Sequence, residues 1–261
     1  MNVQTLASGS SGNCLLVSAG ATRLLVDCGI SAKRIKLSLA QLDLTPADLS
    51  GVLITHEHSD HIAGLATLTK HFPLRLYTSP GTARALTYRM AGLDDLLHTV
   101  EPGESFEVGE LGVETYPISH DAAQPMGFAL TADGKKAAVV TDLGYVSDAV
   151  RAGIRGADLL VCEANHDLEW LRSGSYPQYL ISRIAGDRGH LCNEDGAALA
   201  CLAAESGART VVLAHLSAEN NTPERARAVV ADALARMGAD PERDVALSVA
   251  PRSELGPRWT A

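Results

Sequence analysis

The sequence lacks the segments that mark an exported or membrane-embedded protein. Its first residues show no basic stretch followed by an apolar core, which is the pattern of a secretory signal. The longest apolar runs, such as 137–140 and 159–162, are much shorter than the roughly 20 residues that a membrane-spanning helix needs. We therefore expect a cytoplasmic protein that has no membrane partner.

Cysteine pairs are also missing. The chain has five cysteines, an odd number, and none of them forms a CxxC pair. This usage argues against a disulfide framework and against a thiolate zinc site. We interpret the cysteines as small buried thiols in a reducing compartment. A single reactive cysteine remains the alternative, and Cys14 is its best candidate because it follows a loop rich in glycine and serine.

Nothing in the composition divides the chain. Its 261 residues contain no low-complexity run, no fixed-period repeat and no linker rich in Gly, Ser or Pro. A hydrophobic fraction of 46% excludes global disorder, and a net charge of −9 argues against indiscriminate binding of nucleic acid or anionic membrane. We predict a single domain over residues 1–261.

Short apolar runs alternate with helical patterns along the chain. Strands are expected at 14–18, 23–27, 52–55, 74–78, 137–141, 159–162, 211–214 and 245–249, with strand alternation over 105–131. Helices are expected at 31–42, 61–71, 80–92, 146–154, 175–184, 193–204 (with Asn193 as N-cap) and from 222 onward. A strand-rich part followed by an alternating part occurs twice. This order predicts an α/β fold in which two mixed β-sheets lie between layers of helices.

A histidine–aspartate cluster follows one of these strands. Residues 55–61 read THEHSDH, so that His56, His58, Asp60 and His61 come directly after an apolar run. Leaving buried polar groups unpaired would cost several kcal/mol each. Neutral imidazole and carboxylate suit zinc, manganese or ferrous iron. The spacing therefore predicts a metal site at the carboxyl end of a strand.

Three later residues occupy equivalent positions. His120, Asp142 and His215 each follow a predicted strand. Taken singly, they could be a turn residue, a helix N-cap and a core histidine. Their shared placement at strand ends favours membership of the same metal site, as the carboxyl ends of parallel strands meet at one edge of a sheet.

These motifs resemble a known family. THEHSDH is similar to the HxHxDH signature of the metallo-β-lactamase superfamily, and SHDA (119–122), TDLG (141–144) and AHLS (214–217) resemble its later motifs. The segments GSSGNC (9–14), LLVDCG (24–29), CEANHD (162–167) and GHLCN (189–193) resemble the YycJ/WalJ-type branch, although a serine is expected where Cys192 stands. The resemblance implies a four-layer αββα sandwich with nuclease-like activity.

The resemblance also implies a ligand set for two divalent ions (Zn, Mn or Fe). The first ion would be held by His56, His58 and His120, the second by Asp60, His61 and His215, and Asp142 would bridge them. A histidine at position 58, where flavo-diiron relatives have glutamate, disfavours redox chemistry. The interval between Asp142 and His215 is too short for the inserted cap domain of some RNA-processing relatives.

We therefore expect a dinuclear metal-dependent hydrolase, most simply a phosphodiesterase or nuclease that acts on nucleic acid, including exonuclease activity on DNA. Candidate catalytic residues are Asp60 and His190; candidate substrate contacts are Ser11, Asn13, Asn165 and Arg188; Asp27 is a candidate to orient a metal-binding imidazole. The basic residues Arg172, Arg183 and Arg188 form either a phosphate track or scattered surface charge.

Two alternatives remain open. One is a hydrolase of a small cyclic phosphodiester, lactone or thioester at the same site. The other is a regulatory or binding module without catalytic activity. The oligomeric state is not predicted.

Overall fold

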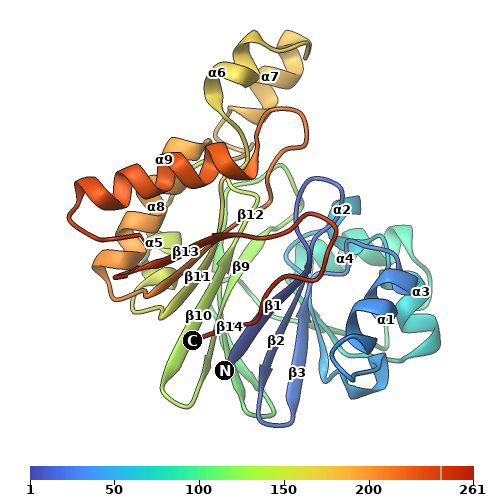
Figure 1. Cartoon of the computed structure of the whole chain (residues 1–261). Helices are drawn as coiled ribbons and strands as arrows, with labels where there is room; N and C mark the ends of the chain where they lie inside the picture. Colours follow the sequence, from blue (N-terminus) through green and yellow to red (C-terminus); the bar gives the residue numbers. More distant parts are fainter. Residues whose placement is uncertain (242) are drawn as a thin grey trace.

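The computed structural model describes residues 1–241 and 243–261, which form two β-sheets that face each other between layers of helices (Figure 1). The first sheet has the strand order β14-β1-β2-β3-β4-β5-β6. Its strands are β1 (Asn2–Ala7), β2 (Cys14–Ala19), β3 (Thr22–Val26), β4 (Gly51–Leu53), β5 (Leu76–Thr78), β6 (Leu97–Thr99) and β14 (Trp259–Thr260). Strands β3 to β6 run parallel, and the remaining neighbours are antiparallel.

The second sheet has the order β13-β12-β11-β10-β9-β8-β7. Its strands are β7 (Ser105–Val108), β8 (Leu111–Pro117), β9 (Met126–Ala132), β10 (Lys135–Val140), β11 (Leu159–Glu163), β12 (Thr210–Ala214) and β13 (Ala246–Val249). Strands β10 to β13 run parallel, whereas β7, β8, β9 and β10 pair antiparallel. Both sheets are therefore mixed.

Most of the helices lie on the outer face of one of the two sheets. The first group comprises α1 (Ala32–Ala40), the 3-10 helix η1 (Pro46–Asp48), α2 (Ser59–Ile62), α3 (Leu65–His71) and α4 (Pro80–Arg89). The second comprises α5 (Asp148–Ile154), α6 (Leu168–Ser173), α7 (Gln178–Ile184), α8 (Asn193–Glu205) and α9 (Pro223–Arg236). The predicted four-layer αββα arrangement is confirmed. No helix in the described ranges is long and apolar enough to cross a membrane.

The central strands β10, β11 and β12 of the second sheet are apolar on both faces because each face contacts a different core. In β10, Ala137 and Val139 pack between the two sheets, whereas Ala138 and Val140 pack against the outer helices. Alternation of this kind requires side chains to point to opposite faces of the sheet. A third cluster, which includes Ile35, lies between the first sheet and its helices. These three apolar cores lie between the successive layers of the fold.

Some boundaries differ from the sequence predictions. The helix expected over 61–71 is broken into α2 and α3 at Gly64, which packs so tightly that a Cβ there would lie 2.2 Å from the carbonyl oxygen of Ile30. The segment 175–184 forms only α7, preceded by Pro177 at its N-cap. Helix α8 has Cys192, not Asn193, as its N-cap, because the Asn193 side chain instead accepts a hydrogen bond from Asn221. Strands β1, β6 and β14 were not predicted.

All five cysteines are free, and four of them are buried. This agrees with the interpretation of the cysteines as small core thiols.

Candidate metal centre

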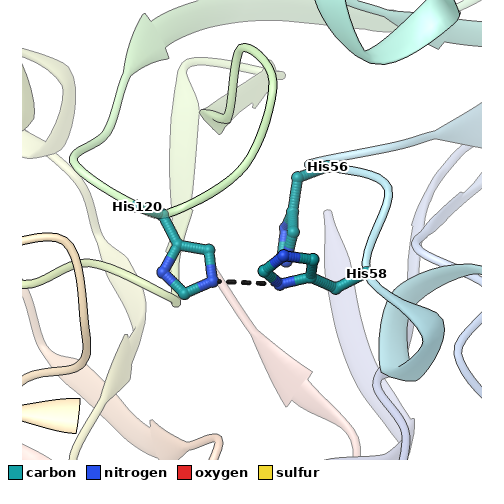
Figure 2. A group of neighbouring side chains, drawn as sticks. All are labelled: His56, His58 and His120. Atoms are coloured by element: carbon teal, nitrogen blue, oxygen red, sulfur yellow. Dashed lines mark hydrogen bonds between the residues drawn. The ribbon is translucent and has the colours of Figure 1, made fainter. Parts of the chain in front are cut away.

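The first cluster consists of three histidines that converge from two loops. His56 and His58 follow β4, and His120 follows β8 (Figure 2). Nδ1 of His58 and Nε2 of His120 lie 3.2 Å apart. One nitrogen from each of the three rings lies within 4.8 Å of the other two. This convergence matches the set predicted for the first ion.

The second cluster lies beside the first and contains two carboxylates. Its members are Asp60, His61, Asp142 and His215, whose candidate ligand atoms also lie within 4.8 Å of one another. Nε2 of His215 lies 3.3 Å from Asp60 and 3.4 Å from Asp142. Nε2 of His61 lies 3.4 Å from Asp60 and 3.3 Å from Asp142. The structure thus brings together the residues predicted for the second ion and for the bridge.

The arrangement follows from the parallel strands of both sheets. His56 comes shortly after β4, Asp142 shortly after β10 and His215 directly after β12, so the carboxyl ends of these strands meet at one edge of the sandwich. Two of these turn residues, Asp142 and His215, have positive φ angles of 61° and 54°. Left-handed backbone is uncommon for residues other than glycine and is concentrated at functional sites.

Hydrogen bonds fix which nitrogen of each buried imidazole faces the centre. Nδ1 of His120 donates to the carbonyl of Gly189 at 3.1 Å, and Nδ1 of His61 donates to Asp27 at 2.7 Å. Nδ1 of His215 lies 2.8 Å from Glu163. Each bond directs Nδ1 to a partner outside the cluster, so that Nε2 is the nitrogen that faces the cluster, as metal-binding histidines require.

Asp27 has the orienting position predicted for it. Its Oδ1 accepts a hydrogen bond from the backbone N–H of Thr55, and its Oδ2 accepts from the Thr55 hydroxyl, both at 2.9 Å. That hydroxyl lies 3.0 Å from Nδ1 of His56, which can donate to it. One buried carboxylate therefore holds His61 directly and His56 through Thr55.

Burial and neighbouring charges favour the unprotonated form of some of the candidate ligands. Burial lowers the pKa of His120, and burial together with the neighbouring His61 lowers the pKa of His56 well below its usual value. Burial would raise the pKa of Asp142, but the nearby His215 and His61 outweigh it and lower that pKa. Burial opposes charge on His215 as well, yet Asp142, Asp60 and Glu163 raise its pKa to about 10. The cluster therefore concentrates negative charge that suits cations.

The two predicted catalytic residues lie at the edge of the cluster. The side chains of Asp60 and His190 are 23% and 20% exposed, whereas that of Asp142 is only 2% exposed. Nδ1 of His190 lies 2.9 Å from Oε1 of Glu163 and 3.7 Å from Asp142. Both residues can thus meet a molecule that enters from solvent.

Two of the predicted substrate contacts reach the second cluster. Nδ2 of Asn13 lies 3.2 Å from Nε2 of His61, and the neighbouring Ser11 is exposed on the same loop. The Asn165 side chain donates to the carbonyl of His215 at 2.9 Å.

A third predicted contact, Arg188, reaches the first cluster. Its Nε and Nη2 both donate to the carbonyl of His120 at 3.2 Å. Asn13, Asn165 and Arg188 therefore contact candidate metal ligands in this structure, and substrate contact by them stays a prediction.

Glu163 is the residue whose place sequence reasoning missed. It ends β11, is fully buried, and its two oxygens accept from His190, His215 and the backbone N–H of Leu191. A charged residue at the end of an apolar strand was a signal for it. The direction of its side chain, however, depends on the pairing of β11 with β10 and β12, which the sequence does not display.

Known proteins are similar to this chain in sequence and in fold. The sequence model of the beta-lactamase superfamily domain matches residues 22–216. The chain is 40% identical over 239 residues to the exodeoxyribonuclease YycJ of Bacillus anthracis, covering 91% of this chain and 90% of that protein. It is 41% identical over 234 residues to the exodeoxyribonuclease WalJ of Streptococcus pneumoniae serotype 2, covering 88% and 87%.

A solved structure supports the fold independently. The crystal structure of Zn²⁺-bound PqqB from Methylobacterium extorquens superposes with a TM-score of 0.74 at 21% identity, covering 100% of both chains. At this identity the likeness concerns the fold alone. The family match and the two relatives show that this chain belongs to the metallo-β-lactamase superfamily, in the branch of YycJ and WalJ.

Proposed function

We propose that this protein is a dinuclear metal-dependent phosphodiesterase that removes nucleotides from DNA ends. The observation that carries the proposal is the pair of adjacent ligand clusters, one of three histidines and one that includes Asp60 and Asp142. Its substrate class rests on the two exodeoxyribonucleases to which the chain is about 40% identical along most of its length.

The residues present fit divalent cations. Nε2 of His56 is buried and has no hydrogen-bond partner among the described residues, although an unpaired buried nitrogen is costly. The donors are imidazole nitrogens and carboxylate oxygens, a set that suits zinc, manganese or iron. We assign His56, His58 and His120 to one ion, Asp60, His61 and His215 to the other, and Asp142 to both. When bound, such ions supply a water of lowered pKa and offset charge on the leaving oxygen.

The chain's own groups then position substrate and protons. The partly exposed carboxylate of Asp60 can accept a hydrogen bond from the attacking water. Glu163 holds the proton of His190 on Nδ1, which leaves Nε2 of His190 as the atom that exchanges a proton with the leaving group. Because Glu163 also orients His215, one buried carboxylate links the proton-transfer residue to the second ligand cluster.

Cleavage assays test this function directly. The purified protein is incubated with Mn²⁺ or Zn²⁺ and end-labelled single- and double-stranded DNA and RNA, in parallel with bis-p-nitrophenyl phosphate. Release of nucleotides from DNA ends is expected. Cleavage of the small ester alone would instead support a small-molecule hydrolase, and no cleavage with no bound metal would support a binding module.

A pair of aspartate variants provides the control. Asp142→Asn removes a carboxylate from the ligand cluster and should abolish cleavage and reduce metal content. Asp148→Asn changes an exposed carboxylate in the first turn of α5 and should leave both unchanged. Equal activity of the two variants would contradict the assigned ligand set.

A further inference from the structure

Helix α7 brings a cationic side chain to the rim of the metal centre. Nε of Arg183 lies 2.6 Å from Oδ2 of Asp121, whose Oδ1 lies 3.4 Å from Nε2 of His120. The Arg183 side chain is nevertheless 57% exposed. Together with α6, α7 stands out from the sandwich (Figure 1). A substrate strand that leaves the metal centre on this side would therefore pass over α7.

An exposed aromatic ring lies on the same face of α7. Tyr179 precedes Arg183 by four residues, so the two side chains are neighbours on the helix surface, about 6 Å apart along its axis. Tyr179 is 76% exposed. By contrast, the guanidinium of Arg225 covers Trp170 of α6 at 4.6 Å from the ring centre. The ring of Tyr179 is thus open to a planar partner.

We propose that Tyr179 is a stacking platform for an unpaired base of the DNA strand whose scissile phosphate lies at the metal centre. Arg183 would contact the phosphate between that base and the centre. The inference rests on the proposed phosphodiesterase function. Grooves that hold single strands combine cations for the backbone with aromatic rings for the bases. Within a duplex, each base face is covered by the adjacent base pair. A single protruding ring therefore favours a DNA end with an unpaired base.

Binding to two matched DNA substrates tests the role of Tyr179. One is a blunt duplex and the other carries a single-stranded overhang; both have phosphorothioate linkages that resist cleavage, and binding is measured by fluorescence anisotropy with Mn²⁺ present. Tyr179→Ala should weaken binding of the overhang about tenfold, the effect of one stacked base, and leave the blunt duplex unaffected. Tyr179→Phe, which keeps the ring, should bind as the native protein does.

Two controls separate stacking from other effects. Tyr88→Ala removes a ring that is 92% exposed on α4 and should not change binding. Hydrolysis of bis-p-nitrophenyl phosphate, which has no base, should not distinguish Tyr179→Ala from Tyr179→Phe. An unchanged affinity of Tyr179→Ala for the overhang, or an equal loss on both substrates, would overturn the inference. If the native protein cleaves the small ester but neither binds nor cleaves DNA, the proposed nuclease function itself fails.

The salt dependence tests the role of Arg183. Arg183→Gln should weaken the binding of both DNA substrates. The plot of log affinity against log salt has a negative slope, and its magnitude should fall by about one because one phosphate contact is lost. An unchanged slope would overturn this half of the inference.

Discussion

Asp27 is the residue that holds one histidine of each cluster. It binds His61 directly and reaches His56 through the Thr55 hydroxyl. Asp27→Asn replaces an acceptor oxygen with an amide group and should weaken metal binding by about 10- to 100-fold, the usual effect of losing such a partner.

The matched control for this change is Asp43→Asn. Asp27 and Asp43 both have positive φ, 62° and 57°, but Asp43 is exposed on the loop after α1. Titration calorimetry with Zn²⁺ or Mn²⁺ measures both variants. Equal affinity of Asp27→Asn and the native protein would show that Asp27 does not orient the ligands.

The contribution of His190 to kcat should depend on how strongly the leaving group needs a proton. His190→Ala should lower kcat on DNA by roughly 10²- to 10⁴-fold, the range for loss of a general acid. It should barely change kcat on bis-p-nitrophenyl phosphate, whose p-nitrophenolate leaves without a proton. Metal content, measured in parallel, should stay at the native value. A similar loss on both substrates would argue against proton donation.

The grouping of the candidate ligands was predictable because their signal is local. His56, His58, Asp60 and His61 share one heptapeptide, and His120, Asp142 and His215 each follow an apolar strand. The contacts of Glu163 with His190 and His215 were not predictable, since they depend on how three strands pair.

Among the elements, the loop between β1 and β2 and the loop between β3 and α1 pack against the backbone of α2, which carries Asp60 and His61. Backbone hydrogen bonds join Asn13 to Asp60 and Cys28 to His61, each at 2.8 Å. A Cβ on Gly29 would lie 1.6 Å from the carbonyl oxygen of Asp60, which is less than any contact permits. Gly29 is therefore needed for the close approach that places Asp60 and His61.

Gly29→Ala should move this loop, lower the free energy of unfolding by at least about 1–3 kcal/mol and reduce metal content. Gly134→Ala is its control, because a Cβ there meets no atom within 4 Å and its φ of 70° adds only backbone strain of about 1–2 kcal/mol. Urea unfolding with metal analysis measures both effects. Full metal content in Gly29→Ala would contradict the role given to this packing.

Element boundaries were predicted less well than element types, because packing can override local pattern. The apolar spacing of 61–71 is helical throughout, yet Gly64 approaches the Ile30 carbonyl and donates its N–H to Cys28, which separates α2 from α3. Strands β1 and β14 pair through residues from opposite ends of the chain, as in Val3 with Trp259. No local sequence pattern indicates a pairing partner so far away along the chain.

At the scale of the whole molecule, the layers follow from the apolar runs along the chain, since the central parallel strands β10, β11 and β12 are apolar on both faces. We propose that residues 1–261 form one domain without an inserted cap. The ligands come from both halves of the chain, so metal binding should stabilise the entire fold. Removal of metal by a chelator should lower Tm by roughly 10 °C in a single transition.

Differential scanning calorimetry measures this change, and restored metal should reverse it. Two separate transitions would contradict a single domain, and an unchanged Tm would contradict the coupling of metal binding to the fold.

The central claim is that the two clusters hold two divalent ions that are both needed for cleavage of DNA. Its most direct test is elemental analysis of the protein during stepwise loading with Mn²⁺ or Zn²⁺, with nucleotide release from end-labelled DNA followed in the same samples. We expect two ions per chain, with full activity only when the second is bound. Full activity with one ion per chain, or DNA cleavage by metal-free protein, would contradict the account.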